Sequence, residues 1–351
     1  MKVGVLDGNG IGPEIIGSMK QVIDAMELGI EWVHVPIAEE AFEKYGTWVP
    51  EESIDLLREL KVAIKGPMSV EKMGGRLIYT RKDGTSQIYC SNNNAIRQEL
   101  DCYACPRPVR GIPGISGKNE NVDIVVIREI SEGIYAGLEH RICGDEASEA
   151  IKLITKAGAE RICRYAFEYA IKNGRKKVTC AHKANAISLT DGLFLATFRR
   201  VARDYPQIES EDFMVDATAF YLVSNPERFD VIVTMNQYGD ILSDLCAGLV
   251  GSLGLGAGAN IGDNCAIFEA CHGSAPDIAG KHLANPTSII LSAAMMLRHI
   301  GMTDEAKTLE DSVREVLIEG SCRTRDIGGT ATTEEFTAAL VAKVKENMHK
   351  C

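Results

Sequence analysis

Short apolar runs alternate with segments of helical spacing in the first part of the chain. Residues 2–8 (KVGVLDG), 30–37 (IEWVHVPI) and 61–67 (KVAIKGP) have the apolar composition of buried strands. Between them, residues 14–26 and 52–60 repeat apolar side chains every three or four positions, which predicts amphipathic helices. This alternation predicts an α/β fold in which helices pack on a sheet.

Three later strands are predicted to end in polar or charged residues. They are residues 122–129 (VDIVVIRE), 177–183 (KVTCAHK) and 229–239 (FDVIVTMNQYG). In open α/β sheets, ligands bind beyond the carboxyl ends of the strands. Arg128, Lys183 and Asn236 lie at such ends, so we expect them near a ligand site.

The remaining pattern suggests how the chain is divided. Residues 147–173 have the spacing of one long amphipathic helix, and residues 207–217 contain a further strand around FMVDA. A chain of 351 residues is long enough for about two domains. The Pro- and Gly-rich stretches at 106–117 and 248–262 are the expected crossing points between them.

The turn after the first strand, GNGIG (Gly8 to Gly12), invites comparison with a dinucleotide-binding loop. Its spacing is G-x-G-x-G and not the G-x-G-x-x-G of that loop. Pro13 and Glu14 follow directly, and a carboxylate in the first helical turn would repel the pyrophosphate that a helix N-terminus attracts. We therefore interpret the segment as a tight strand-to-helix turn.

Composition and charge limit the class of partner. The net charge of −11 argues against nucleic-acid binding, which needs a basic surface. The sequence has no signal-peptide core and no apolar run of the roughly 18 residues that span a bilayer. The 11 cysteines are an odd number and do not resemble a secreted disulfide framework. We expect no membrane partner and a cytoplasmic protein, with an organelle matrix as the alternative.

Arginines gather in one part of this acidic chain. Arg97, Arg107 and Arg128 could each bind a carboxylate through two hydrogen bonds, although surface ion pairing is the commoner fate of an arginine. Arg97 lies one turn after Asn93, in a segment SNNN that is rich in helix-capping residues. A helix N-terminus, a hydroxyl, an amide and a guanidinium together predict an anion-binding site.

Two further pairs of residues are candidates for chemistry. Asp240 and Asp244 share one face if NQYGDILSD is helical, and like charges at that spacing destabilise a helix. A site of few oxygen ligands suits Mg²⁺ or Mn²⁺, and the alternative is a solvated acidic face. Tyr135 and Lys183 are candidate proton carriers, since a lysine near arginines and a metal loses its proton more readily. Alone, each is more often structural.

Taken in order, these segments resemble the isocitrate/isopropylmalate dehydrogenase family of β-decarboxylating dehydrogenases. The resemblance rests on the motifs GNGIGPE, NAIRQELDCYACPRPV, VIREISEGIYAG, AHKAN, NQYGDILSD, CHGSAPDIAGKHLANP and RTRDIGG. It implies an α/β, isopropylmalate dehydrogenase-like two-domain fold that is not a Rossmann fold. Residues 1–100 and 255–351 would form a large, cofactor-side domain, and residues 101–254 a small domain with the dimer contacts. The partner subunit of a homodimer or larger homo-oligomer would complete the active site in the cleft.

The resemblance also implies the reaction and the residues that bind the substrate. The reaction would be metal-dependent oxidative decarboxylation of a 2-hydroxy acid, with hydride transfer to a nicotinamide cofactor. Arg97, Arg107 and Arg128 would clamp the substrate carboxylates. Tyr135 would protonate the enolate carbon after CO₂ leaves.

Other roles implied by the resemblance involve two subunits. Lys183, with Asn185 beside it, would take the hydroxyl proton after reaching in from the neighbouring subunit. Asp240 and Asp244 would hold Mg²⁺ or Mn²⁺, joined by Asp216 from the partner subunit.

Ser91 and Asn93 bear on the choice of substrate. They occupy positions where isocitrate dehydrogenases of this family hold the third carboxylate, whereas isopropylmalate enzymes have apolar or bulky residues there. A hydroxyl and an amide favour an anion, because an alkyl group would leave their donors unpaired. We therefore predict isocitrate as the tricarboxylate substrate, with homoisocitrate or 3-isopropylmalate as alternatives. The bordering segment 68–90 is longer than the corresponding loop of isocitrate dehydrogenases.

The segment HGSAPDIAG bears on the choice of cofactor. Asp277 and Ile278 stand where NADP-using relatives have a lysine and a tyrosine for the 2′-phosphate. A carboxylate accepts hydrogen bonds from a ribose diol and repels a phosphate, which predicts NAD. Glu269 would lie near the nicotinamide ribose. The residues expected on the adenosine side are His272, Gly273, Ala275 and Asn285.

A non-catalytic regulatory subunit of a hetero-oligomer is the alternative from another functional class. Such subunits usually lack part of the set of tyrosine, lysine and aspartates. Tyr135, Lys183, Asp216, Asp240 and Asp244 are all present here, so the sequence favours an enzyme.

Overall fold

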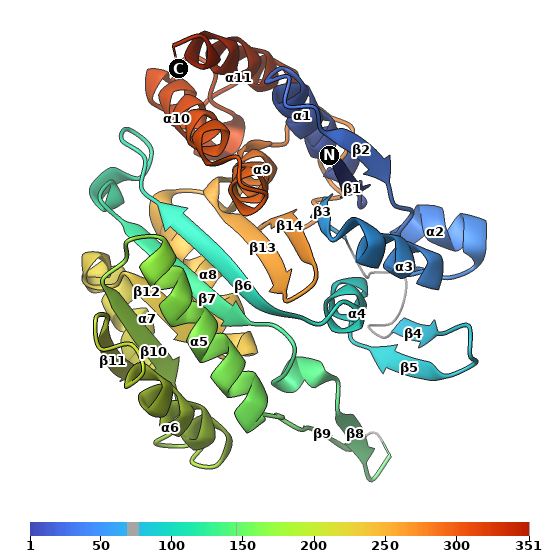
Figure 1. The fold of residues 1–351 in the computed structure, drawn as a ribbon, viewed down its shortest axis with the longest axis vertical. Coiled ribbons are helices and arrows are strands. Elements are labelled where there is room, and N and C mark those ends of the chain that lie inside the picture. The colour runs from blue at the N-terminus through green and yellow to red at the C-terminus, as the bar shows by residue number, and fades with distance from the viewer. Residues whose placement is uncertain (69–76, 145, 351) are drawn as a thin grey trace.

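The structure is a computed structural model that describes residues 1–68, 77–144 and 146–350. Residues 69–76 of the long segment 68–90 therefore lie outside the described residues. One mixed sheet runs through the molecule, with helices on both faces (Figure 1). In the described part of the chain, no helix combines the length and apolar character that a membrane crossing needs.

Among the described residues, the sheet has ten strands, and two hairpins stand apart from it. In spatial order the strands are β11 (Glu209–Met214), β10 (Lys177–His182), β12 (Val231–Thr234), β7 (Asp123–Glu129), β6 (Cys102–Arg110), β13 (Ala257–Gly262), β14 (Ala266–Ala270), β3 (Val62–Lys65), β1 (Lys2–Leu6) and β2 (Glu31–His34). The hairpins are β4 (Leu77–Thr80) with β5 (Ser86–Tyr89), and β8 (Glu139–Ile142) with β9 (Ala147–Ala150).

The helices lie mostly between successive strands. They are α1 (Gly12–Asp24), α2 (Ala38–Tyr45), α3 (Glu51–Leu60), α4 (Asn92–Glu99), α5 (Lys156–Lys172), α6 (Thr190–Ala202), α7 (Val215–Ser224), α8 (Asn236–Val250), α9 (Thr287–His299), α10 (Thr303–Glu319) and α11 (Thr333–Met348). Short 3₁₀ turns include η2 (Ile134–Ala136). The strands predicted at 2–8, 30–37, 61–67, 122–129, 177–183 and 229–239 contain β1, β2, β3, β7, β10 and β12, and the helices predicted at 14–26 and 52–60 correspond to α1 and α3.

The direction of the strands reverses in the middle of the sheet. Strands β7, β12, β10 and β11 are mutually parallel, as are β14, β3, β1 and β2. Between these two blocks, β6 runs antiparallel to β7, and β13 runs antiparallel to both β6 and β14. The two parallel blocks therefore run in opposite directions and meet at β6 and β13.

Separate groups of helices cover the two blocks. Helices α1, α9, α10 and α11 form one apolar core with β1, β3, β13 and β14, so the beginning and end of the chain pack together (Figure 1). Helices α5 and α6 cover one face of the β7–β11 block, and α7 and α8 cover the other. The domain boundaries at 100/101 and 254/255 remain a prediction.

Two predicted elements need correction. The helix predicted over 147–173 is wrong at its start, because residues 147–150 form strand β9 against β8. Helix α5 begins only after Thr155, whose hydroxyl accepts a hydrogen bond from the Gly158 amide at 3.0 Å and caps the helix. The strand around FMVDA lies earlier than expected: β11 ends at Met214, and α7 begins with Val215.

The segment GNGIG is the tight turn that its spacing predicts. Gly8 and Gly10 have φ of 72° and 63°, a region that favours glycine. The Asn9 amide donates to the Pro67 carbonyl and the Ile11 amide to the Ser274 carbonyl, both at 2.9 Å. These amides are therefore engaged with two other loops.

Substituting alanine for Gly10 is expected to destabilise the protein by about 2 kcal/mol or more, because a Cβ there would lie 2.0 Å from the Ser274 carbonyl oxygen at a positive φ. The matched control is Gly17→Ala in α1, where a Cβ meets nothing within 4 Å and should stabilise by about 0.5–1 kcal/mol. Urea unfolding of both variants measures the difference. Equal changes in the free energy of unfolding of the two variants would contradict the tight contact between Gly10 and the Ser274 carbonyl.

Candidate active site

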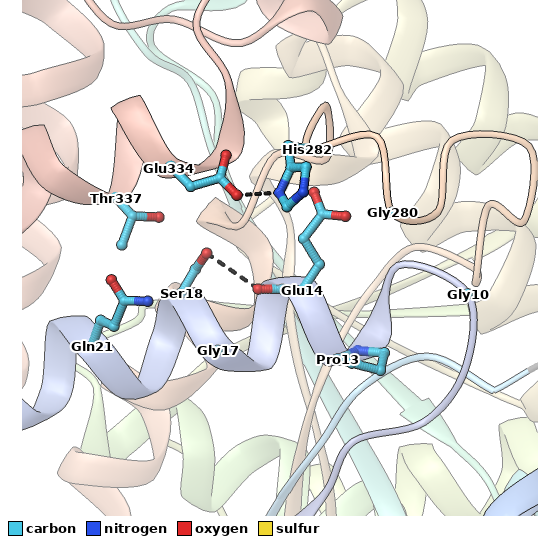
Figure 2. A pocket seen from close by; sticks show the side chains of 10 residues that line it. All are labelled: Gly10, Pro13, Glu14, Gly17, Ser18, Gln21, Gly280, His282, Glu334 and Thr337. Carbon is cyan, nitrogen blue, oxygen red and sulfur yellow. Dashed lines mark hydrogen bonds and ion pairs between the residues drawn. The ribbon is translucent and has the colours of Figure 1, made fainter.

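One cavity of about 400 Å³ lies between α1 and the start of α11 (Figure 2). Its lining includes Glu14 and the ion-paired Glu334 and His282. Carboxylates in this position would repel a substrate that carries several carboxylates. None of the predicted site residues lines this cavity.

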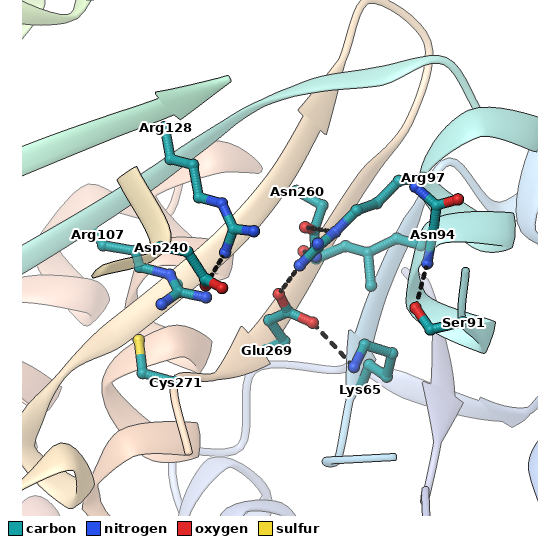
Figure 3. A network of polar contacts seen from close by, with 12 residues as sticks. Lys65, Ser91, Asn94, Arg97, Arg107, Arg128, Asp240, Asn260, Glu269 and Cys271 are labelled. Atoms are coloured by element: carbon teal, nitrogen blue, oxygen red, sulfur yellow. Dashed lines mark hydrogen bonds and ion pairs between the residues drawn. The ribbon is translucent and has the colours of Figure 1, made fainter. Parts of the chain in front are cut away.

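A second cavity of about 260 Å³ brings most of the predicted site residues together (Figure 3). The predicted residues that line it are Ser91, Asn93, Arg97, Arg107, Arg128, Tyr135, Asp240, Glu269, His272 and Gly273. They come from α4, β6, β7, η2, α8, β14 and the segment after β14. The cavity therefore lies where the two parallel blocks of the sheet meet.

The register of the central strands places two of the arginines side by side. Arg128 on β7 pairs with Cys105 on β6, two residues from Arg107. Because side chains alternate along a strand, Arg107 and Arg128 emerge on the same face of the sheet. Both are buried, at 7% and 3% exposure. Buried guanidinium groups need partners, and their contacts therefore define the chemistry of the site.

Arg128 is held on two sides. The Asn236 side-chain oxygen accepts hydrogen bonds from its Nε at 3.1 Å and its Nη2 at 2.8 Å, and Asp240 accepts from its Nη1. Burial, together with the positive charges of Arg97 and Arg107, lowers the pKa of Arg128 to about 10. It stays charged at neutral pH, and the guanidinium groups of Arg97, Arg107 and Arg128 line one cavity. Such a place favours a bound anion.

Glu269 joins the arginines to Lys65. Its two oxygens accept from Lys65 Nζ at 2.8 Å and Arg97 Nη2 at 2.9 Å, and the Asn260 side chain accepts from Arg97 Nε at 2.7 Å (Figure 3). Burial alone would raise the pKa of Glu269, but Lys65 and Arg97 hold it below its usual range. Glu269 therefore lies at the cavity wall, with both oxygens already engaged.

Helix α4 supplies the polar wall that the segment SNNN predicts. The helix begins after Ser91, whose hydroxyl accepts from the Asn94 amide at 3.1 Å. The side-chain oxygen of Asn93 is buried and has no hydrogen-bond partner among the described residues. A buried polar atom without a partner at a cavity wall is costly unless a ligand completes it. The predicted helix start is therefore present, and Ser91 and Asn93 line the cavity.

Tyr135 lies on η2 between Gly133 and Gly137. Its hydroxyl donates to Asp240 Oδ2 at 3.0 Å, and the Arg128 guanidinium carbon is 5.5 Å from its ring centre. Burial, and then the charge of Asp240, raises the pKa of Tyr135. The phenol therefore keeps its proton at neutral pH and can act as a proton donor.

The two aspartates of α8 lie beside the arginines, as predicted. Asp244 accepts from Arg107 Nη1 at 3.2 Å. Burial, which outweighs the opposing effect of Arg107, raises the pKa of Asp244, and Asp240 adds to the rise. In the described residues, no three His, Cys, Asp or Glu side chains form a metal-binding group. The pair fits Mg²⁺ or Mn²⁺, which commonly bind one or two carboxylates and take other oxygens from substrate or water.

Lys183, Asn185 and Asp216 do not line the cavity of their own chain. Lys183 follows β10, and its Nζ donates to Asp216 Oδ1 at 2.8 Å in the first turn of α7. This hydrogen bond lowers the pKa of Asp216. Their role in the site of a second subunit stays a prediction.

The predicted cofactor residues follow β14. His272 Nε2 is buried without a hydrogen-bond partner in the part of the chain that the structure describes, and burial lowers its pKa, so the ring is neutral. Asp277 is exposed and available as an acceptor. Asn285 is engaged with the Thr287 amide and Asp326, and Ala275 and Ile278 pack against the core around α1 and α9. The free ring nitrogen and the exposed carboxylate fit a dinucleotide.

Sequence reasoning missed several residues of the cavity. Lys65, Asn94 and Cys271 line it without having been predicted. Lys65 had a usable signal, since it lies near the end of the strand predicted at 61–67. Asn236 was expected near a ligand, but its role as the partner of Arg128 depends on side-chain geometry that the sequence does not contain.

Replacing Glu269 by glutamine is expected to reduce the free energy of unfolding at pH 7 by about 3–5 kcal/mol, because Lys65 would lose a buried ionic partner. The folded-state pKa of Glu269 lies below that of an unfolded glutamate, so its stabilisation is present above about pH 4.3 and is lost as the pH falls. Urea unfolding between pH 3 and 7 should show the two proteins converging in acid. Glu334→Gln, in an exposed ion pair, is the control and should change little.

Known proteins resemble this chain over almost its whole length. The family described as Isocitrate/isopropylmalate dehydrogenase matches residues 2–340. A regulatory subunit of the mitochondrial NAD isocitrate dehydrogenase of Dictyostelium discoideum is 44% identical over 350 residues, covering 99% of this chain and 93% of that protein. Isocitrate dehydrogenase [NAD] catalytic subunit 5 of Arabidopsis thaliana is 44% identical over 334 residues (95% and 86%), and 3-isopropylmalate dehydrogenase of Archaeoglobus fulgidus is 44% identical over 335 residues (95% and 97%).

The crystal structure of isocitrate dehydrogenase from Methylococcus capsulatus has a similar fold. Its TM-score is 0.91 at 44% identity, with 98% of this chain and 99% of that chain covered. This likeness confirms the predicted α/β fold. Together, the match to the family and the likeness to its solved member show that the chain belongs to the isocitrate/isopropylmalate dehydrogenase family of β-decarboxylating dehydrogenases.

Proposed function

We propose that this chain catalyses the metal-dependent oxidative decarboxylation of isocitrate to 2-oxoglutarate, with NAD as the hydride acceptor. The observation that carries the proposal is that Ser91 and Asn93 line one cavity with Arg97, Arg107 and Arg128. A tricarboxylate would find a cation or a polar hydrogen-bonding group for each carboxylate. An alkyl group in place of the third carboxylate would leave polar atoms of the wall unpaired.

The chain's own residues bind the substrate and move a proton. The three guanidinium groups orient the carboxylates, and Asn236 holds Arg128 through Nε and Nη2, so its Nη1 faces Asp240 and the substrate. After CO₂ leaves, the O–H bond of Tyr135 breaks. Its proton forms a new C–H bond on the carbon that had carried the CO₂. The phenolate then regains a proton from water.

Asp240 and Asp244 would hold the divalent cation, and the segment from His272 to Ile278 would hold NAD. When bound, the cation supplies Lewis-acid polarisation of the substrate hydroxyl and carboxylate, and NAD accepts the hydride. Asp277 is exposed at this segment and would accept from a ribose diol but repel a 2′-phosphate, which supports NAD over NADP.

The proposed assembly is a homodimer or larger homo-oligomer, with the cavity between a domain of residues 1–100 and 255–351 and a domain of residues 101–254. Cavity residues come from both segments, as Arg97 and Arg128 illustrate. Leu189, Phe220 and Ile241 are 85%, 64% and 60% exposed on the second segment. Large apolar side chains so exposed favour burial against a second copy.

Two observations favour other candidates. Met68 and Ile130 also line the cavity and would suit the alkyl group of 3-isopropylmalate or the added methylene of homoisocitrate. One relative of equal identity is a regulatory subunit. The chain nevertheless keeps Tyr135, Asp240 and Asp244 in one place, which supports a catalytic subunit.

Initial-rate measurements on the purified chain with Mn²⁺ test the proposal. We expect kcat/KM for isocitrate to exceed that for homoisocitrate and 3-isopropylmalate by at least about tenfold. An unpaired polar group opposite the alkyl group of 3-isopropylmalate costs about 1–3 kcal/mol, and the added methylene of homoisocitrate costs a similar amount. NAD should be preferred to NADP. Metal chelation should abolish turnover, and added Mn²⁺ should restore it.

Two other outcomes of these rate measurements would change the proposed function. Faster turnover of 3-isopropylmalate would move the assignment to that substrate. No NAD reduction with any of the three acids would favour the regulatory alternative and overturn the enzyme proposal.

A shared active site can be tested by mixing inactive variants. Lys183→Met and Asp240→Asn should each lower kcat by roughly a hundredfold or more, because each removes a group proposed to act in the reaction. If a site uses Asp240 of one chain and Lys183 of the other, half of a randomly assembled dimer population is mixed and has one intact site per dimer. Co-expression should then restore about a quarter of wild-type activity. A mixture no more active than its parents would contradict sharing.

A further inference from the structure

Helix α4 contacts the turn that carries Tyr135 through a side chain that the reaction itself does not use. Asn94 Nδ2 donates to the Tyr135 main-chain carbonyl at 3.1 Å. Asn94 is 5% exposed, and the thiol of Cys90, just before the helix, lies 3.8 Å from the same carbonyl. Segments that are 41 residues apart in sequence are thereby joined at the cavity.

The position of α4 is fixed at both ends. At its start, Ser91 caps the helix through the Asn94 amide. At its end, the Glu99 side chain is 5% exposed and accepts from the Tyr89 hydroxyl at 2.5 Å and from Arg81 of the β4–β5 hairpin. A helix held in this way provides a rigid reference point for Asn94.

The turn of Tyr135 is intrinsically less constrained. Gly133 and Gly137 flank it with φ of 84° and 77°. Main-chain hydrogen bonds of 2.8 and 3.3 Å join Gly133 to Leu153, whereas the bonds after Gly133 are local, such as Gly137 amide to Ile134 carbonyl at 3.2 Å. The Tyr135 hydroxyl contacts Asp240. The carbonyl bond to Asn94 fixes the main chain, and the hydroxyl bond fixes only the tip of the side chain.

We propose that Asn94 is a positioning residue that sets Tyr135 for proton transfer and couples it to the helix that carries Ser91, Asn93 and Arg97. The inference rests on the proposed function, in which Tyr135 donates the proton. Substrate bound at Ser91 and Asn93 then holds the same rigid helix that aligns the proton donor. Binding of the third carboxylate and positioning of the Tyr135 phenol therefore depend on the same helix.

Two substitutions test the inference. Asn94→Asp keeps the shape of the side chain and places a carboxylate in the first turn of α4, where it favours the helix, but it cannot donate to the Tyr135 carbonyl. Asn94→Ala removes the donor without adding charge. We expect both to lower kcat roughly 10- to 100-fold, the scale of a small misplacement of a reacting group. In Asn94→Ala, KM for isocitrate should change by less than about threefold, because the carboxylate-binding groups stay in place. Asn94→Asp should in addition raise KM, because it adds a negative charge to the cavity wall.

The matched control is Asn119→Asp. Asn119 Nδ2 makes the same kind of bond, to the Leu249 carbonyl at 2.7 Å, and the residue is buried but does not line the cavity. The kcat of the Asn119→Asp variant should stay near the wild-type value. A comparable fall in this variant would show a general loss of structure and would overturn the positioning role.

A double-mutant cycle separates positioning from folding. In a Tyr135→Phe background, Asn94→Asp should cause little further loss of kcat, because the hydroxyl that it positions is gone. The solvent deuterium isotope effect on kcat should rise in Asn94→Asp alone, as proton transfer becomes slower than the other steps. Full additivity, or an unchanged isotope effect, would overturn the inference.

Hydrogen exchange gives a readout that does not depend on turnover. The amides of Ala136 and Gly137, whose hydrogen bonds lie within the turn, should exchange faster in Asn94→Asp than in wild type, and those of α11 should not change. Unchanged exchange at this turn would overturn the inference even if activity fell. If Tyr135→Phe left isocitrate turnover intact, the proposed role of Tyr135 as proton donor would fail. If Asn94→Asp alone left turnover intact, only the positioning role of Asn94 would fail.

Discussion

The site depends on one electrostatic constraint: several positive side chains are buried close together at the centre of a sheet. Removing a charge from water costs several kcal/mol per ion unless partners replace the lost hydration. Glu269 meets this need for Lys65 and Arg97, and Asp240 with Asn236 meets it for Arg128. Burial, with the charges of Arg97 and Arg107, still lowers the pKa of Arg128, so the arginine cluster is held at an electrostatic cost. The groups that stabilise one another here are the same groups proposed to bind the substrate carboxylates.

The reversal of strand direction makes this crowding possible. In a sheet of uniform direction, side chains at the carboxyl ends would line one edge. Here β6 and β13 join two blocks of opposite direction, so residues from β3, β7 and β14 converge near the middle of the sheet. Helices α4 and α8 then add Arg97 and Asp240. The site is consequently held by the sheet core, and short turns such as η2 add Tyr135.

Sequence patterns were sufficient for those parts of the structure that depend on local spacing. Strands β1, β2, β3, β7, β10 and β12, the start of α4 at Ser91 and the shared face of Asp240 and Asp244 follow from periodicity and capping, whereas β6, β13 and β14 were not predicted. The error at 147–150 arose because that segment's pairing with β8 is a contact between exposed strands, which leaves no apolar pattern. Asn94 could not be found either. Its role depends on a hydrogen bond to a carbonyl in a distant segment, and any of the polar residues in SNNN would look alike in sequence.

The turn from Gly8 to Gly12 has a consequence for altering the protein's coenzyme. Its amides attach to both the Pro67 and Ser274 carbonyls, and its glycines leave no room for a side chain against either. An insertion or deletion of one residue in this turn would displace the segments that carry Pro67 and Ser274 together. If the proposed NAD site is correct, changes of nucleotide preference have their usable freedom at outward-facing positions such as Asp277, because the main chain nearby is attached to the first turn of the chain.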